Sequence, residues 1–336
     1  MMHSPRLLRS MLMTGAAIAA LLLAACDPLA PFPTPTAVVI IVTPEPSNTP
    51  PPTSTPLPSA TPTDVPTATP TATATPDPCV TQPGQVIEFD EFSSDIANEQ
   101  IRYRVYVPPC YQQLQKRYPV VYLLPGLRQD ETTWGAVGVV EALEQGMRLG
   151  ALSPMILVMP EIGSIGIADQ FVPDPSFEQV LLEELVPAIE RDFCVITNRD
   201  YRSIGGISRG GFWAYSVALR HPDLFGAVGG HSAYLDAAEA PDTVSPLALA
   251  SNDAFLPQAN LRMYLDNAAA DPAGTTLELF SSRLAARGIA HNYNIYPDGG
   301  HDEAYWSAHV SEYLSFYAAN WPRNVNNLPS CMEPSP

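Results

Sequence analysis

The chain has 336 residues and a formal net charge of −18 at pH 7, with 17 Lys and Arg against 35 Asp and Glu. Because binding to nucleic acid depends on basic side chains that neutralise phosphates, we expect no nucleic acid partner. The 37 prolines and five cysteines are unevenly distributed, and they divide the chain into a leader, a linker and a folded domain.

Residues 1–26 have the features of an export signal. Arg6 and Arg9 precede an apolar run at 11–23, and small residues, Ala24 and Ala25, come directly before Cys26. The apolar run is shorter than the ~20 residues that a membrane-spanning helix needs. The segment resembles the lipobox of bacterial lipoproteins, which implies that the leader is removed and that Cys26 is lipidated. We therefore predict an extracytoplasmic protein with a lipid anchor in the cell membrane; a plain secretory cleavage site, and hence a secreted protein, is the alternative.

Residues 27–78 consist mainly of Pro, Thr, Ala and Ser with almost no charge. Such a composition cannot bury enough apolar surface to fold, so we predict a disordered linker. If fully extended at ~3.1 Å per residue, it reaches roughly 160 Å.

Residues 79–336 are numerous enough for one α/β core without a second domain. Apolar and polar residues alternate at 85–92 and 100–107, which predicts an antiparallel hairpin. Continuous apolar runs predict buried strands at 118–124, 155–159, 225–229, 261–265 and 289–296, and helical spacing predicts helices at 139–149, 177–193, 276–287 and 303–317. Alternating strands and helices favour a mostly parallel central sheet with helices on both faces.

The folded domain contains four cysteines, Cys79, Cys110, Cys194 and Cys331. An even number in an exported domain predicts two disulfides, for which three pairings are possible. We favour Cys79–Cys110, because these residues lie at the two ends of the hairpin, and Cys194–Cys331 then follows by elimination. None of the four has the spacing of a metal site, so no metal is expected.

A candidate nucleophile lies in Gly206-Ile-Ser-Arg-Gly210. An apolar run precedes this G-x-S-x-G pattern and a helical pattern at 212–219 follows it, which is the arrangement of a nucleophile elbow. Glycines are needed there because a serine on a strained turn leaves no space for neighbouring Cβ atoms. The alternative is an ordinary strand-to-helix turn in which Ser208 caps the helix.

A serine nucleophile needs a histidine base and an acid that orients the base, in the chain order Ser, acid, His for α/β-hydrolases. His301 follows the glycine-rich loop after the last predicted strand, so it is the predicted base. Asp271 is the favoured acid because it lies deeper in the loop after 261–265, and Asp266 at the strand end is the second choice. The other downstream histidines, His231, His291 and His309, are interpreted as structural.

An oxyanion hole requires two backbone N–H groups directed at the developing negative charge. We predict that the N–H of Arg209 supplies one and that of Leu127, after Pro125-Gly126, supplies the other; a simple Pro-Gly turn is the alternative. The side chain of Arg209 either braces a carboxylate or contacts substrate.

Three aromatic residues, Trp134, Tyr305 and Trp306, lie on segments predicted to flank the pocket. They form either a platform for an aromatic acyl group or a sugar, or part of the core.

Four segments together resemble the putative esterase family, which includes feruloyl and acetylxylan esterases, S-formylglutathione hydrolases, siderophore esterases and mycolyltransferases. They are Tyr122-Leu-Leu-Pro-Gly-Leu127 with Thr132-Thr-Trp134, Gly206-Ile-Ser-Arg-Gly-Gly211, residues 265–272, and Gly299-Gly-His-Asp-Glu-Ala-Tyr-Trp306. The resemblance implies an α/β-hydrolase fold, no cofactor, and a catalytic triad of Ser208, Asp271 and His301.

These observations predict a surface-tethered serine carboxylesterase that cleaves an acyl ester through an acyl-enzyme. Its substrate is a small-molecule or polysaccharide ester, with feruloyl or acetyl groups on polysaccharide as the first expectation. S-formylglutathione is not expected, because its hydrolysis relies on a cytosolic thiol. The alternatives are acyl transfer to a sugar, as in mycolyltransferases, and a non-catalytic surface binding module.

Overall fold

The computed structural model describes residue 79 and residues 82–236, 240–333 and 335. The predicted leader, its lipobox cysteine Cys26 and the predicted linker at 27–78 lie outside the described residues, so the division of the chain into three parts stays a prediction. Within the described residues, no helix combines the length and the apolar character needed to cross a membrane.

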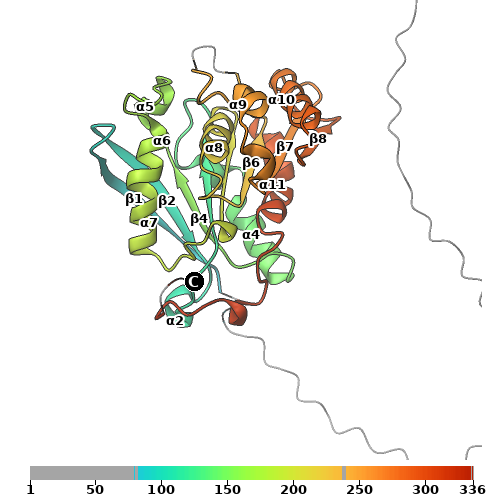
Figure 1. Cartoon of the computed structure of the whole chain (residues 1–336). Coiled ribbons are helices and arrows are strands. Elements are labelled where there is room, and N and C mark those ends of the chain that lie inside the picture. The colour runs from blue at the N-terminus through green and yellow to red at the C-terminus, as the bar shows by residue number, and fades with distance from the viewer. Residues whose placement is uncertain (1–78, 80–81, 237–239, 334, 336) are drawn as a thin grey trace, which may run out of the picture. The chain divides into compact units, whose positions relative to one another are not determined.

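The described domain is built on one sheet of eight strands in the order β1-β2-β4-β3-β5-β6-β7-β8 (Figure 1). The first two strands form an antiparallel hairpin, and β2 pairs antiparallel with β4. All the other pairs are parallel. The strands are β1 (Gln85–Ser94), β2 (Glu99–Val107), β3 (Val120–Leu124), β4 (Ile156–Pro160), β5 (Arg202–Ile207), β6 (Ala227–His231), β7 (Arg262–Ala268) and β8 (Asn292–Tyr296).

Helices cover both faces of this sheet, because the side chains of each buried strand alternate between two apolar layers. In β3, Val120, Tyr122 and Leu124 belong to the layer that also contains residues of α7, α8 and α10. Val121 and Leu123 belong to the opposite layer, together with residues of α4 and α11. The predicted mostly parallel sheet, its N-terminal hairpin and its covering on both faces are therefore confirmed.

The longer helices are α4 (Val139–Arg148), α7 (Val186–Asp192), α8 (Arg209–Arg220), α9 (Pro246–Asn252), α10 (Gly274–Ala286) and α11 (Glu303–Tyr317). The shorter ones are α2 (Tyr111–Leu114), α3 (Thr133–Ala136), α5 (Gly163–Ile167), α6 (Phe177–Gln179), η1 (Val180–Leu185), η2 (Arg199–Tyr201), η3 (Leu256–Gln258) and η4 (Val325–Asn327).

Several element boundaries differ from the prediction. The helix expected at 177–193 is divided into α6, a π-helical segment η1, and α7. The short helices α5 and α9 were not predicted, since neither is long enough to show a clear helical period. Strand β7 runs to Ala268 rather than ending at Leu265, so Asp266 lies within the strand.

Two disulfides, Cys79–Cys110 and Cys194–Cys331, have the favoured pairing, with Cα–Cα distances of 5.4 and 5.6 Å. Both lie at the amino ends of the parallel strands. Cys110 follows β2, whose C-terminal end pairs beside the start of β4, and Cys194 accepts a backbone hydrogen bond from Tyr118, just before β3. Figure 1 accordingly shows α2 and the C-terminal end of the chain together at the bottom of the domain.

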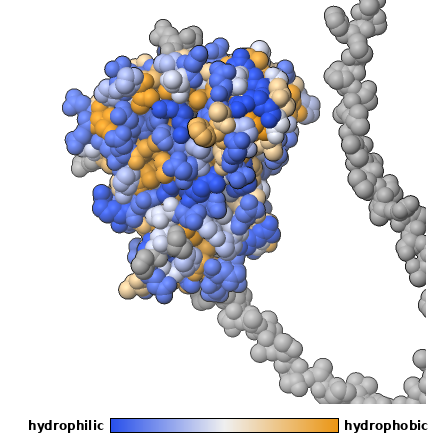
Figure 2. Space-filling model, in the orientation of Figure 1, coloured by the Kyte–Doolittle hydropathy of each residue, from blue (hydrophilic) through white to orange (hydrophobic). Residues whose placement is uncertain are grey.

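The face of the domain seen in Figure 2 is mainly hydrophilic, with scattered hydrophobic patches. Large apolar side chains that are exposed include Leu127 and Ile167, at 49% and 43% of their full accessible surface. Both belong to a cavity beside Ser208.

Candidate active site

Ser208 lies at the sharp turn between β5 and α8. Its backbone has φ 54° and ψ −114°, a conformation that L residues rarely adopt. A Cβ on Gly206 would lie 2.1 Å from the backbone carbon of Gly210, and one on Gly210 would lie 2.4 Å from the carbonyl oxygen of Leu124. The glycines are therefore required for strand and helix to approach each other, as the sequence predicts for a nucleophile elbow.

The structure brings the three predicted triad residues together. The Ser208 hydroxyl lies 2.9 Å from His301 Nε2. His301 Nδ1 lies 3.0 Å from Asp271 Oδ1 and 3.2 Å from Oδ2. The Asp271 side chain is fully buried, whereas the imidazole keeps 24% of its surface exposed. This is the geometry in which an imidazole accepts a serine proton while a carboxylate fixes its orientation.

Two loops at the carboxyl ends of neighbouring strands hold the acid and the base. Asp271 closes a turn after β7, in which its N–H donates to the Ala268 carbonyl and its Oδ1 accepts from the N–H of Ala273 at 2.8 Å. His301 follows the loop after β8 and directly precedes Asp302, whose side chain caps α11. Because parallel strands end at one edge of the sheet, both loops reach Ser208.

The surroundings of Asp271 favour its ionised form. Burial raises the pKa of this carboxyl, but hydrogen bonds from His301 and the backbone N–H of Ala273 contribute to lowering the pKa below its ordinary value. Asp271 is therefore charged near neutral pH, and a charged carboxylate at this distance would stabilise an imidazolium at His301.

The two predicted oxyanion donors lie beside Ser208. A Cβ on Gly126 would be 3.3 Å from the Ser208 Cβ, so the loop that carries Leu127 runs past the nucleophile. In the turns, loops and helix ends of the described residues, neither Leu127 nor Arg209 donates its N–H to another backbone group. Arg209 is also the first residue of α8, where N–H groups have no partner within the helix.

Residues 94–317 match the sequence model of the putative esterase family. The chain belongs to this family. The fold agrees, since a solved structure described as a ferulic acid esterase superposes with a TM-score of 0.63 and 24% identity, over 70% of this chain and 98% of that one.

Two curated relatives are similar to part of the esterase domain. An endo-1,4-beta-xylanase/feruloyl esterase of Xylanibacter ruminicola is 34% identical over 136 residues, which are 36% of this chain and 18% of the relative. Esterase Rv1288 of Mycobacterium tuberculosis is 31% identical over 134 residues, 38% of this chain and 28% of the relative. The matches therefore span less than a third of the length of either relative.

Two cavities with different linings adjoin the Ser208–His301 pair. One, of about 400 Å³, is lined by Ser208 and by Leu127, Ile167, Asp169, Arg209, Tyr234 and Asp236. The other, of about 460 Å³, is lined by His301 and by Gln129, Asp302, Glu303, Ala304 and Trp306. Within the described part of the chain, no group of three or more His, Cys, Asp or Glu side chains is arranged to hold a metal ion.

A second, fully buried set of polar side chains lies behind the site. His231 Nδ1 lies 2.7 Å from Asp266 Oδ1, and the hydroxyls of Tyr305 and Tyr313 donate to Asp266 Oδ2 at 2.6 and 2.9 Å. Asp266 is fully buried, and its side-chain contacts are with His231, Tyr305 and Tyr313. Asp266, the second choice for the acid, therefore makes its contacts with His231 and the two tyrosines, whereas Asp271 contacts His301.

This buried network also decides the role of two predicted aromatic residues. Tyr305 is 3% exposed and bonded to Asp266, and Trp134 is 1% exposed, with its indole N–H bonded to the Leu124 carbonyl and its ring 5.8 Å from that of His231. Both have the packing role, not the predicted contact with substrate. Trp306 differs, because its ring lies 5.4 Å from the His301 ring and lines the cavity on that side.

Sequence reasoning did not find Tyr234 or Asp169. The ring of Tyr234 packs edge-on against the His301 ring, with centroids 5.1 Å apart. Asp169 forms an ion pair with the Arg209 guanidinium, which settles that this side chain braces a carboxylate. No local motif marks either residue. The only signal was that Tyr234 follows the strand adjacent to the nucleophile strand.

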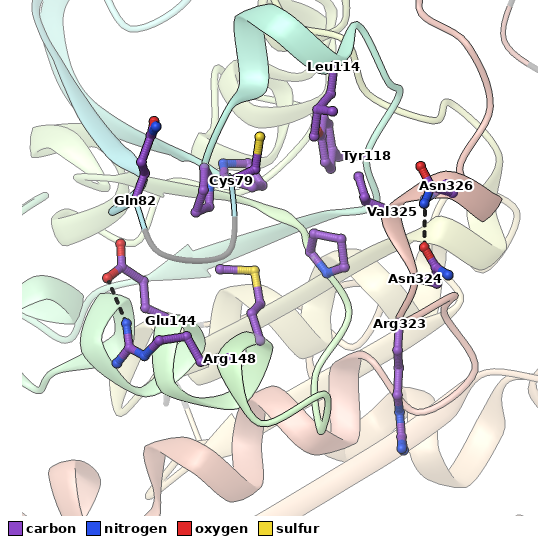
Figure 3. A pocket seen from close by; sticks show the side chains of 14 residues that line it. Cys79, Gln82, Leu114, Tyr118, Glu144, Arg148, Arg323, Asn324, Val325 and Asn326 are labelled. Carbon is purple, nitrogen blue, oxygen red and sulfur yellow. Dashed lines mark hydrogen bonds and ion pairs between the residues drawn. The ribbon is translucent and has the colours of Figure 1, made fainter. Parts of the chain in front are cut away.

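A third cavity, of about 210 Å³, lies at the opposite end of the sheet (Figure 3). It is lined by residues such as Tyr118, before β3, and Asn326 in η4, and an ion pair between Glu144 and Arg148 lies at its side. Ser208 and His301 are not among its lining residues, so this cavity is separate from the candidate active site.

Proposed function

We propose that this protein is a serine carboxylesterase that hydrolyses acyl esters, with feruloyl or acetyl groups on polysaccharide as its substrates. Ser208 attacks the ester carbonyl while His301 accepts its proton, and His301 then returns the proton to the departing alcohol. Water, activated by the same imidazole, cleaves the acyl-enzyme to a carboxylate and free Ser208. Asp271 orients the imidazole, and the N–H groups of Leu127 and Arg209 hold the oxyanion.

The observation that carries this proposal is the unbroken chain of hydrogen bonds from Ser208 through His301 to Asp271, at 2.9 and 3.0 Å. Membership of the esterase family supports the reaction class. The feruloyl preference rests on two similar proteins, a xylanase/feruloyl esterase and a ferulic acid esterase.

The test is hydrolysis of p-nitrophenyl acetate and methyl ferulate by the wild type and by Ser208→Ala. Removal of the nucleophile is expected to lower kcat by about 10⁶-fold, as loss of a triad serine does in serine proteases. A fluorophosphonate probe is expected to label the wild type only. Equal rates for the two proteins would refute the mechanism.

The same residues would support acyl transfer to a sugar acceptor. Analysis of products with trehalose or glucose present separates the two reactions, because hydrolysis yields the free acid and transfer yields a sugar ester. A non-catalytic binding module is less well supported, since Ser208, His301 and Asp271 are all present and in contact. Absence of probe labelling on folded protein would favour it.

We also infer that residues 1–26 are a cleaved leader, that Cys26 carries lipid, and that residues 27–78 tether the esterase domain outside the cytoplasm. The support is the sequence pattern alone. Metabolic labelling with a radioactive fatty acid tests this inference: label is expected in the wild type and absent in Cys26→Ser. An unlabelled wild type would favour secretion.

A further inference from the structure

The two cavities beside the catalytic residues take different parts of an ester. In the proposed reaction His301 gives a proton to the departing alcohol, so the alcohol must lie on the side of the imidazole. The cavity of about 460 Å³ is lined by His301 and not by Ser208, whereas the cavity of about 400 Å³ is lined by Ser208 and not by His301. The acyl group therefore enters the latter, which we call the acyl cavity.

Arg209 supplies the acyl cavity with a cation that is already neutralised. Its guanidinium pairs with Asp169 and lies over the Phe212 ring at 4.7 Å. The Arg209 side chain is only 10% exposed, and that of Asp169 is 35% exposed. Burial lowers the pKa of Arg209 to about 10, so it remains charged near neutral pH and its charge is taken up by Asp169.

Carboxylates dominate the remaining charge around the reaction centre. Apart from the paired Asp169, Asp236 lines the acyl cavity, and Asp302 and Glu303 line the cavity on the alcohol side. Arg209 is the one Lys or Arg among the described residues that line either cavity. No ion pair between described residues involves Asp236, which is exposed.

We propose that the Asp169–Arg209 ion pair makes the acyl cavity selective for uncharged acyl groups, an inference that rests on the esterase function proposed above. A carboxylate on the acyl chain would lose water on entering the cavity without gaining a free cationic partner, because Asp169 occupies Arg209. It would also approach Asp236, a like charge. Feruloyl and acetyl groups carry no charge and avoid both costs.

The Asp169–Arg209 ion pair also predicts how a variant at Asp169 changes the preference for acyl groups. Replacing Asp169 with asparagine preserves the size of the side chain but removes its charge. Arg209 would then present an unpaired guanidinium to the acyl cavity, and guanidinium binds carboxylates through two parallel hydrogen bonds. The variant is therefore expected to gain activity on anionic acyl groups, which loss of structure alone would not produce.

The experiment compares two p-nitrophenyl esters of equal acyl length, the hexanoate and the monoester of adipic acid. The wild type is expected to show a kcat/KM at least about tenfold higher for the hexanoate, a factor that corresponds to about 1.4 kcal/mol. Because the preference comes from charge, it is expected to shrink when salt is raised from about 0.01 M to about 1 M.

Asp169→Asn is expected to reduce the hexanoate preference by about tenfold, chiefly through a faster reaction with the adipate. Asp236→Asn is the matched control, since it also removes one carboxylate from the acyl cavity but frees no cation; its change in preference is expected to stay below about threefold. In Asp169→Asn/Arg209→Met the gain on adipate is expected to disappear.

Equal rates of the wild type on both esters would overturn the proposal, even if Asp169→Asn failed to fold. So would a folded Asp169→Asn that keeps its hexanoate rate and its preference unchanged, or a control that changes as much as Asp169→Asn. If the wild type cleaves neither ester and fluorophosphonate does not label Ser208, the esterase function itself fails. If Ser208 is labelled and the hexanoate is cleaved, but the wild type cleaves both esters at equal rates, only the proposed charge selectivity fails.

Discussion

Two aspartates were candidates for the acid of the triad, and the structure gives them distinct roles that replacement by asparagine separates. Asp271 faces His301, and Asp266 faces His231. An asparagine at 271 can donate its amide N–H to His301 Nδ1, which leaves the imidazole with its proton on Nε2. That tautomer cannot accept the proton of Ser208.

The expected size of each effect follows from these contacts. Asp271→Asn is expected to lower kcat by about 10⁴-fold, as the corresponding change does in a serine protease, which raises the barrier by about 5 kcal/mol. Asp266 is fully buried and accepts hydrogen bonds from His231, Tyr305 and Tyr313. Asp266→Asn removes one partner from a buried charged network and is expected to cost about 3–5 kcal/mol of unfolding free energy.

The assay pairs kcat for p-nitrophenyl acetate with urea unfolding of the same preparations. Asp271→Asn is expected to stay folded with little activity, and Asp266→Asn to be less stable while its folded fraction keeps kcat within about tenfold of the wild type. The reasoning is refuted if Asp271→Asn keeps a kcat within tenfold of the wild type, or if Asp266→Asn loses activity at unchanged stability.

Two further predictions concern the stability of the folded domain. Gly206→Ala is expected to destabilise the fold by roughly 3 kcal/mol, because its Cβ would meet backbone atoms at 2.1 Å; an unchanged urea midpoint would contradict this. Loss of the Cys194–Cys331 disulfide, which spans 137 residues, is expected to cost about 5 kcal/mol, and loss of Cys79–Cys110, which spans 31, about 4 kcal/mol. Unfolding of the two double Cys→Ala variants checks the order, and the reverse order would count against the chain-entropy explanation.

The sequence predicted the parts of the site that depend on chain order and local conformation. The glycines around Ser208 and the loop before His301 are local features, and the order of strand ends determines which loops can meet. The mostly parallel sheet and its helices on both faces followed from the alternation of predicted strands and helices in the same way.

The sequence could not predict contacts between side chains that are distant along the chain. Asp266 lies near the end of β7 and Asp271 lies in the loop just after it, so the sequence alone does not show which carboxylate contacts His301. In the structure, two tyrosines of α11 bind Asp266. The pairing of Arg209 with Asp169 likewise depends on how the segment after α5 lies against α8. No residue pattern encodes such a packing arrangement.

The two ends of the described chain lie at the end of the domain opposite Ser208. Cys79 is joined to Cys110, and Ser335 accepts a hydrogen bond from the N–H of Thr197, so both ends of the described chain emerge at the amino ends of the strands. Ser208 opens at the carboxyl ends. A domain coupled to a bead through either end of its described residues would thus present Ser208 outward, and an insoluble polymer could reach it without passing the point of attachment.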